Sequence, residues 1–123
     1  MRRSRVEIVR VYEDSGRSGA EYRVLVDRLW PRGVRKESLD LDEWAREAAP
    51  STDLRRWYGH VPERFEEFSR RYRLELKGAP GADALESLAA RYRRGPMVLL
   101  TATRDVERSG AEVLRSLLTA KVR

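Results

Sequence analysis

Residues 97–102 read Met-Val-Leu-Leu-Thr-Ala, and residues 22–27 read Tyr-Arg-Val-Leu-Val-Asp. Gly95-Pro96 precedes the first run, and Pro31 with Gly33 follows the second. Short, almost continuously apolar runs of this kind are typical of strands that are covered on both faces, as in a parallel sheet. We therefore expect the two runs to be neighbouring parallel strands of one sheet, with helices covering both of its faces.

A third strand is predicted at the start of the chain, over residues 6–11, where β-branched residues alternate on both faces. The stretch from Asp14 to Gly19 follows it. This stretch has two glycines and no apolar side chain, so it is predicted to be a surface loop.

Several helical patterns separate and follow the two apolar runs. They are expected from Asp40 to Pro50, from Ser51 or Thr52 to Gly59, from Pro62 to Gly78, from Asp83 to Gly95, and around Val113 to Leu118. In the first and fourth patterns an aspartate stands three residues before a glutamate, which is the spacing of a capping box. Strands alternating with helices predict a small α/β protein, a single domain over residues 1–123 with three layers and a mostly parallel sheet flanked by helices.

The composition agrees with one globular domain and excludes several kinds of site. The chain has 123 residues, of which 41% are hydrophobic, and it has no cysteine and one histidine, His60. Disulfides, thiolate metal sites and a cysteine nucleophile are therefore excluded, and a metal site built from several histidines is excluded as well, so no metal is expected. Because the Walker A and dinucleotide-binding glycine motifs are also missing, the sequence identifies no cofactor.

The charge balance favours anionic partners. The chain has 26 basic and 20 acidic residues, for a net charge of +6. Twenty-three of the basic residues are arginines, a skew that codon usage in a high-GC genome also produces, so the charge has both a functional and a compositional interpretation. The basic first residues are followed by no apolar segment, which predicts a cytoplasmic protein without a membrane partner; the oligomeric state is left open.

Candidate site residues cluster where the two apolar runs end, because ligands of open parallel sheets bind beyond the carboxyl ends of the strands. We predict an anion-binding crevice there, since arginine presents a planar fork of donors suited to phosphate or carboxylate. In this hypothesis the anion is held by Arg28, Arg32 and Arg104, protons are handled by Asp27 or His60, a ligand ring stacks on Trp30, and Ser51, Arg55 and Asp105 reach the same crevice.

Six of these nine residues also have a purely structural interpretation. Asp27 and Arg28 are adjacent and could form an ion pair that closes the strand end. Asp105 could cap the last helix, for which Ser109, three residues before Glu112, is a rival cap. In the same way Trp30 and His60 could serve packing alone, and Ser51 could serve only as a helix cap.

Three segments carry a family resemblance. Residues 26–33 (V-D-R-L-W-P-R-G), residues 49–60 (A-P-S-T-x-L-R-x-W-Y-G-H) and residues 65–72 (F-x-x-F-x-x-R-Y) resemble the YeaO-like branch of the domain-of-unknown-function family 488. The resemblance covers residues 6–118. It implies a small bacterial or archaeal α/β protein, and it implies no established reaction.

One segment departs from that family pattern. Such proteins tend to have a lysine-aspartate pair and then a histidine-asparagine segment after the last strand, whereas this chain reads Thr103-Arg104-Asp105-Val106-Glu107-Arg108-Ser109-Gly110. If that histidine is catalytic in relatives, this chain lacks it, which argues against a shared acid-base mechanism.

Three functions follow as hypotheses. The first is binding of a small anionic ligand, a nucleotide or a phosphorylated metabolite, at the strand ends, either as an enzyme or as a binding protein. The second is nucleic-acid binding through a broad arginine surface. The third is a regulatory partner without a ligand. A pocket needs a few converging arginines, whereas nucleic-acid binding needs an extended basic patch, and the sequence does not place the arginines.

Overall fold

The computed structural model describes residues 5–122, and its centre is a sheet of parallel strands. The strands are β1 (Val6–Arg10), β2 (Tyr22–Leu25), β3 (Glu43–Trp44) and β4 (Met97–Thr101), in the spatial order β1-β4-β2-β3. Met97 is in register with Val6 on one side and with Tyr22 on the other. The two apolar runs are therefore adjacent parallel strands, as predicted.

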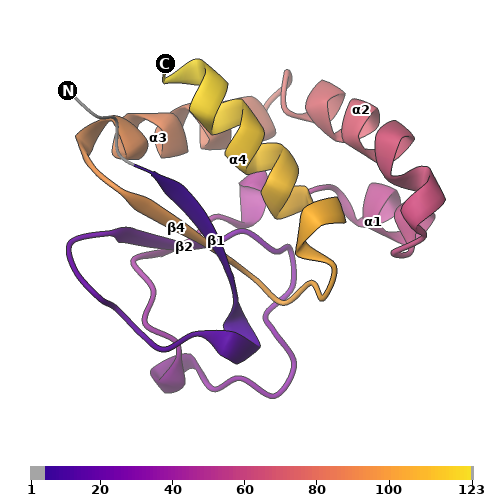
Figure 1. Cartoon of the computed structure of the whole chain (residues 1–123). Helices are drawn as coiled ribbons and strands as arrows, with labels where there is room; N and C mark the ends of the chain where they lie inside the picture. Colours follow the sequence, from indigo (N-terminus) through magenta and orange to yellow (C-terminus); the bar gives the residue numbers. More distant parts are fainter. Residues whose placement is uncertain (1–4, 123) are drawn as a thin grey trace.

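Four α-helices cover one face of this sheet (Figure 1). They are α1 (Thr52–Tyr58), α2 (Phe65–Glu75), α3 (Gly81–Arg94) and α4 (Gly110–Lys121). The apolar sides of these helices form one core with Met97 and Leu99 of β4, while Val98 and Leu100 belong to the core on the opposite face. Within residues 5–122, no helix is long and apolar enough to cross a membrane.

The opposite face of the sheet is covered by irregular chain. Four side chains from the segment between β2 and β3 pack there on the sheet residues Leu25, Val98 and Leu100: Trp30, Val34, Leu39 and Leu41. The only regular structure in this segment is a 3₁₀ turn. The α/β class and the parallel sheet are confirmed, but α-helices cover only one face. The segment contains Pro31 and Gly33 and has no apolar stripe of helical period, so it covers the sheet without forming a helix.

The predicted helix from Asp40 to Pro50 is wrong. The chain forms β3 and a 3₁₀ turn instead, because the backbone N–H groups of Asp42 and Ala45 donate to the carbonyls of Arg23 and Leu25 (2.8 Å each) and complete the edge of β2. Asp40 binds Arg17 rather than capping a helix. The cap predicted at Asp83 is also misplaced, since α3 already begins at Gly81.

The other helix ends follow the local sequence. Ser51 caps α1 by accepting from the Leu54 N–H (3.1 Å), and Gly59 ends α1 in the left-handed conformation, with φ of 53°. Ser109 caps α4 through the Glu112 N–H (3.3 Å). The cap interpretation of Asp105 is therefore wrong for α4, and the rival Ser109 holds that position.

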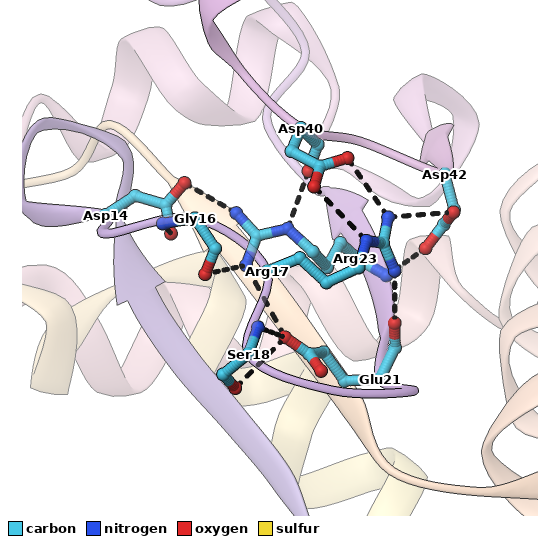
Figure 2. Close-up of polar contacts among 8 residues, drawn as sticks. All are labelled: Asp14, Gly16, Arg17, Ser18, Glu21, Arg23, Asp40 and Asp42. Atoms are coloured by element: carbon cyan, nitrogen blue, oxygen red, sulfur yellow. Dashed lines mark hydrogen bonds and ion pairs between the residues drawn. The ribbon is translucent and has the colours of Figure 1, made fainter.

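A network around Arg23 attaches the irregular layer to the sheet (Figure 2). The Arg23 side chain leaves β2 on the helix-free face and is 1% exposed. Its guanidinium donates to Asp14 (2.5 Å) and to the carbonyls of Asp40 (2.6 Å) and Gly16 (3.3 Å). Arg17 joins the same network by donating to Asp40 and Asp42 (3.1 Å). Two loops that are distant in sequence are thus held on one buried cation.

Replacing Arg23 is expected to destabilise the fold strongly. Arg23→Gln leaves the nearly buried Asp14 carboxylate without its cation, and breaking a buried pair in this way costs about 3–5 kcal/mol. Chemical denaturation measures the loss. The control Arg70→Gln removes an exposed arginine paired with Glu67, and its loss of stability should be much smaller because water screens an exposed ion pair. Equal losses in the two variants would contradict a structural role for the network.

The network also predicts acid sensitivity. Hydrogen bonding from Arg17 lowers the pKa of Asp40 below its ordinary value. Since the folded pKa is below the unfolded one, Asp40 stabilises the fold above about pH 4, and that stabilisation is lost as the pH falls further. Melting curves between about pH 6 and 3 should therefore show a smaller acid-induced fall for Asp40→Asn than for the wild type. Glu63→Gln, at an exposed position outside the network, should follow the wild type.

Candidate functional site

A cleft of about 770 Å³ opens at the carboxyl ends of β2 and β4, bordered by α1 and the first residues of α4. We call it the strand-end cleft. Of the nine candidate site residues, seven line it: Asp27, Arg28, Trp30, Arg55, His60, Arg104 and Asp105. Parallel strands end at one edge of the sheet, and this is why segments distant in sequence meet there.

Asp27 lies deep in the cleft and is held by β4. Its carboxylate accepts from the Thr101 hydroxyl and from the Ala102 N–H, both at 2.7 Å. Burial raises the pKa of Asp27, while these two donors and the nearby charges of Arg55 and His60 oppose the rise. No ion pair joins Asp27 to Arg28 in the described chain, so that structural interpretation of the pair is wrong.

Arg28 has a structural role in the fold. Its guanidinium donates to the carbonyls of Pro50 (2.9 Å) and Ala49 (3.0 Å), the residues just before α1. These carbonyls would otherwise lie unpaired, since both residues are buried. Arg28 therefore forms part of the cleft wall by fixing the entry to α1.

Three other arginines border the cleft, and their side chains have no hydrogen bond or ion pair to any residue of the described chain: Arg55, Arg56 and Arg104. Arg55 is half-buried on α1, whereas Arg56 and Arg104 are exposed. Gly110 and Ala111, the first residues of α4, line the same cleft, and the first N–H groups of a helix have no intrahelical partner. The cleft thus gathers donors and positive charge.

Trp30 and Asp105 line the cleft but are also occupied by the protein. The indole of Trp30 packs edge to face on Trp44 with ring centroids 5.5 Å apart, and its N–H donates to the Val34 carbonyl (2.6 Å). Asp105 forms an ion pair with Arg108 at 2.9 Å. Trp30 is therefore a rigid wall, and the charge of Asp105 is largely compensated.

His60 stands at the mouth of the cleft. It is exposed, and its backbone has a positive φ of 59° directly after the left-handed Gly59. Non-glycine residues seldom adopt this conformation, although histidine tolerates it better than most. His60 lines the same cleft as Asp27 and is near enough for its charge to lower the pKa of that carboxyl.

Arg32 and Ser51, the other two candidates, do not line the cleft. Arg32 is exposed in the turn after Pro31, and its carbonyl accepts from the Tyr12 hydroxyl (2.8 Å). Ser51 caps α1 and donates from its hydroxyl to Glu75 (2.5 Å). Their positions favour structural roles.

The sequence missed Arg56 and the start of α4 as parts of the cleft. Arg56 follows Arg55 on a predicted helix, so a paired-arginine signal was present but did not say which face of the helix meets the cleft. Gly110 allows α4 to approach closely: a Cβ at this position would come within 3.2 Å of the Pro50 ring. In the described chain, no three histidine, aspartate or glutamate side chains gather to hold a metal.

Comparisons with known proteins find sequence relatives over nearly the whole chain. A family model described as "Inactive DUF488-N3 subclade" matches residues 5–123. An uncharacterised protein of Mycobacterium tuberculosis is 45% identical over 121 residues, 98% of this chain and 99% of that protein. The uncharacterised protein YeaO of Escherichia coli is 38% identical over 114 residues, 92% of this chain and 96% of YeaO. No solved structure matches the chain.

Replacing Arg28 should cost stability whether or not a ligand is present. Arg28→Gln loses two hydrogen bonds from a charged donor to buried carbonyls, and we expect a loss of about 2 kcal/mol or more in the free energy of unfolding. Arg104→Gln removes the same charge from an exposed position on the cleft and should change stability by less than about 0.5 kcal/mol. Denaturant titration of both variants tests this, and an unchanged stability in Arg28→Gln would show that these bonds do not matter.

Proposed function

The chain belongs to the DUF488 family, and on that premise we propose that its strand-end cleft binds a small phosphate-bearing ligand without converting it. The family model that matches is described as inactive, which supports binding rather than catalysis. Both oxygens of Asp27 already accept a hydrogen bond from β4 or the residue after it, which further supports a binding role.

The observation that carries this proposal is that the Arg55 side chain has no partner within the described chain. Arg55 is half-buried and lines the cleft, yet its side chain has no hydrogen bond or ion pair within residues 5–122. Arg23, Arg28 and Arg115, which are also wholly or partly buried, each have hydrogen-bond partners. None of the Arg55 nitrogens is fully buried, so water can solvate them in the free protein, and an anionic ligand would replace that water with charge-assisted hydrogen bonds.

The surroundings of Arg55 favour an anion with several acceptor oxygens. Arg56, Arg104 and the first turn of α4 contribute further donors around the same space. Of the two carboxylates there, Asp105 is compensated by Arg108, so positive charge exceeds negative charge. A phosphate group, which offers three terminal oxygens to arginine forks and to a helix N-terminus, fits this arrangement.

The outer surface favours a small ligand over nucleic acid. Many exposed arginines are paired locally with carboxylates: Arg70 and Arg71 with Glu67, Arg35 with Glu37, and Arg93 with Glu86. The two neighbours of Glu67 lower its pKa to about 2, so it stays ionised and compensates them at neutral pH. Local compensation weakens a broad basic patch, whereas the arginines of the cleft are largely uncompensated.

Arg55→Gln should weaken phosphate binding at least tenfold at low ionic strength, because Arg55 is the half-buried arginine of the cleft whose side chain has no partner within the described chain. Isothermal calorimetry with methyl phosphate measures the change in Kd. The matched control is Arg73→Gln, which removes one exposed charge from α2 outside the cleft and should leave the Kd within about twofold. Equal effects in the two variants, or no binding by the wild type, would refute the proposal.

A further inference from the structure

The strand-end cleft is much larger than an inorganic anion. Its volume of about 770 Å³ falls within the range of about 300–1,000 Å³ that is usual for sites of small organic molecules. A phosphate group held by Arg55 and the start of α4 would leave most of this space to water. The size of the cleft therefore favours a phosphate ester whose organic part occupies the remainder.

One part of the cleft wall is apolar. Leu29 is 61% exposed and is one of the few large apolar side chains with so much surface in the described chain. It lines the cleft beside Trp30 and Pro31. Trp30 is fixed by its contact with Trp44 and by its hydrogen bond to Val34. A rigid, apolar surface of this kind suits the face of a ring and would be partly removed from water by it.

Asp27 places a hydrogen-bond acceptor in the wall of the cleft. An anion site gains nothing from a second anion in its wall, because like charges repel. A carboxylate has about four acceptor positions, and the Thr101 hydroxyl and the Ala102 N–H use two of them. Arg55 lies close enough to affect the pKa of Asp27, but the hydrogen bonds to that carboxylate within the described chain come from Thr101 and Ala102 and not from Arg55. Asp27 therefore retains the capacity to accept hydrogen bonds from a donor on a ligand.

From these three features we infer that the cleft selects phosphate monoesters of a hydroxylated ring, with the phosphate at Arg55, the ring against Leu29 and Trp30, and a ring hydroxyl donating to Asp27. Sugar phosphates and the sugar-phosphate part of nucleotides share this chemistry. The inference rests on the proposed function and adds the class of organic group. It assigns Asp27 a role in specificity, without a proton transfer.

The test compares three phosphate monoesters on the wild-type protein by calorimetry. Methyl phosphate has no ring, cyclopentylmethyl phosphate has a five-membered ring without hydroxyls, and ribose 5-phosphate has hydroxyls on its ring. We expect ribose 5-phosphate to bind at least tenfold more tightly than cyclopentylmethyl phosphate, because only its hydroxyls can donate to the carboxylate. Equal or weaker binding of ribose 5-phosphate would overturn the inference.

Asp27→Asn then locates the source of the preference. The variant should lower the advantage of ribose 5-phosphate over cyclopentylmethyl phosphate at least threefold, since a neutral amide is a weaker acceptor than a carboxylate. It should bind methyl phosphate at least as tightly as the wild type, because a negative charge has been removed from beside the anion. The control Asp105→Asn removes the other carboxylate of the cleft and should change all three affinities alike.

The outcomes separate this inference from the proposed function. If methyl phosphate binds and depends on Arg55, but the ring hydroxyls bring no advantage, the anion site stands and the hydroxylated ligand is refuted. An advantage that persists unchanged in Asp27→Asn refutes the role of Asp27. If none of the three esters binds, both proposals fail. The comparison of the three esters uses the wild-type protein alone. It can therefore refute the inference even if Asp27→Asn folds poorly.

Discussion

The whole molecule depends on β4, which is paired on both edges and buried on both faces. All five of its residues are buried, and it lies between β1 and β2 in a parallel ladder. Parallel neighbours require long crossover connections, so the remaining elements are arranged around this strand. Because β2 and β4 end at the same edge, Asp27 meets Thr101, which is 74 residues later in the chain. The central pairing thus creates both the core and the strand-end cleft.

Arginine serves three physical purposes in this protein. Arg23 is a buried cation that holds two loops to the sheet, and Arg28 satisfies the buried carbonyls of Ala49 and Pro50. Arg55 is partly desolvated and has no partner within the described chain. The net charge of the chain does not distinguish these roles, because the role of each arginine depends on its burial and on its hydrogen-bond partners. The case for a ligand therefore rests on the unpaired arginines of the cleft and not on the net charge of the chain.

The sequence predicts where the candidate site lies, but it does not predict the role of each residue in it. The rule that ligands bind at strand ends placed Asp27, Arg104 and five other candidates on one cleft. The same rule gave no means of separating Arg28, whose partners lie just before α1, from Arg55, which has none. Arg32 and Ser51 were included because they flank the right segments, although the turn after Pro31 and the capping of α1 direct them elsewhere.

The local sequence is enough to predict the two buried strands, the helix that Ser51 caps and Gly59 ends, and the edge of the sheet at which a site would form. These features depend on side-chain periodicity and on hydrogen bonds between residues close in the chain. The strand at Glu43 and Trp44 and the irregular chain on one face of the sheet follow instead from contacts between segments that are distant in sequence. The free edge of β2 offers backbone carbonyls to the chain around Glu43, and these hydrogen bonds outweigh the capping-box spacing of Asp40 and Glu43. The hydrogen-bond partners of a polar side chain are likewise fixed only when the sheet brings distant segments together.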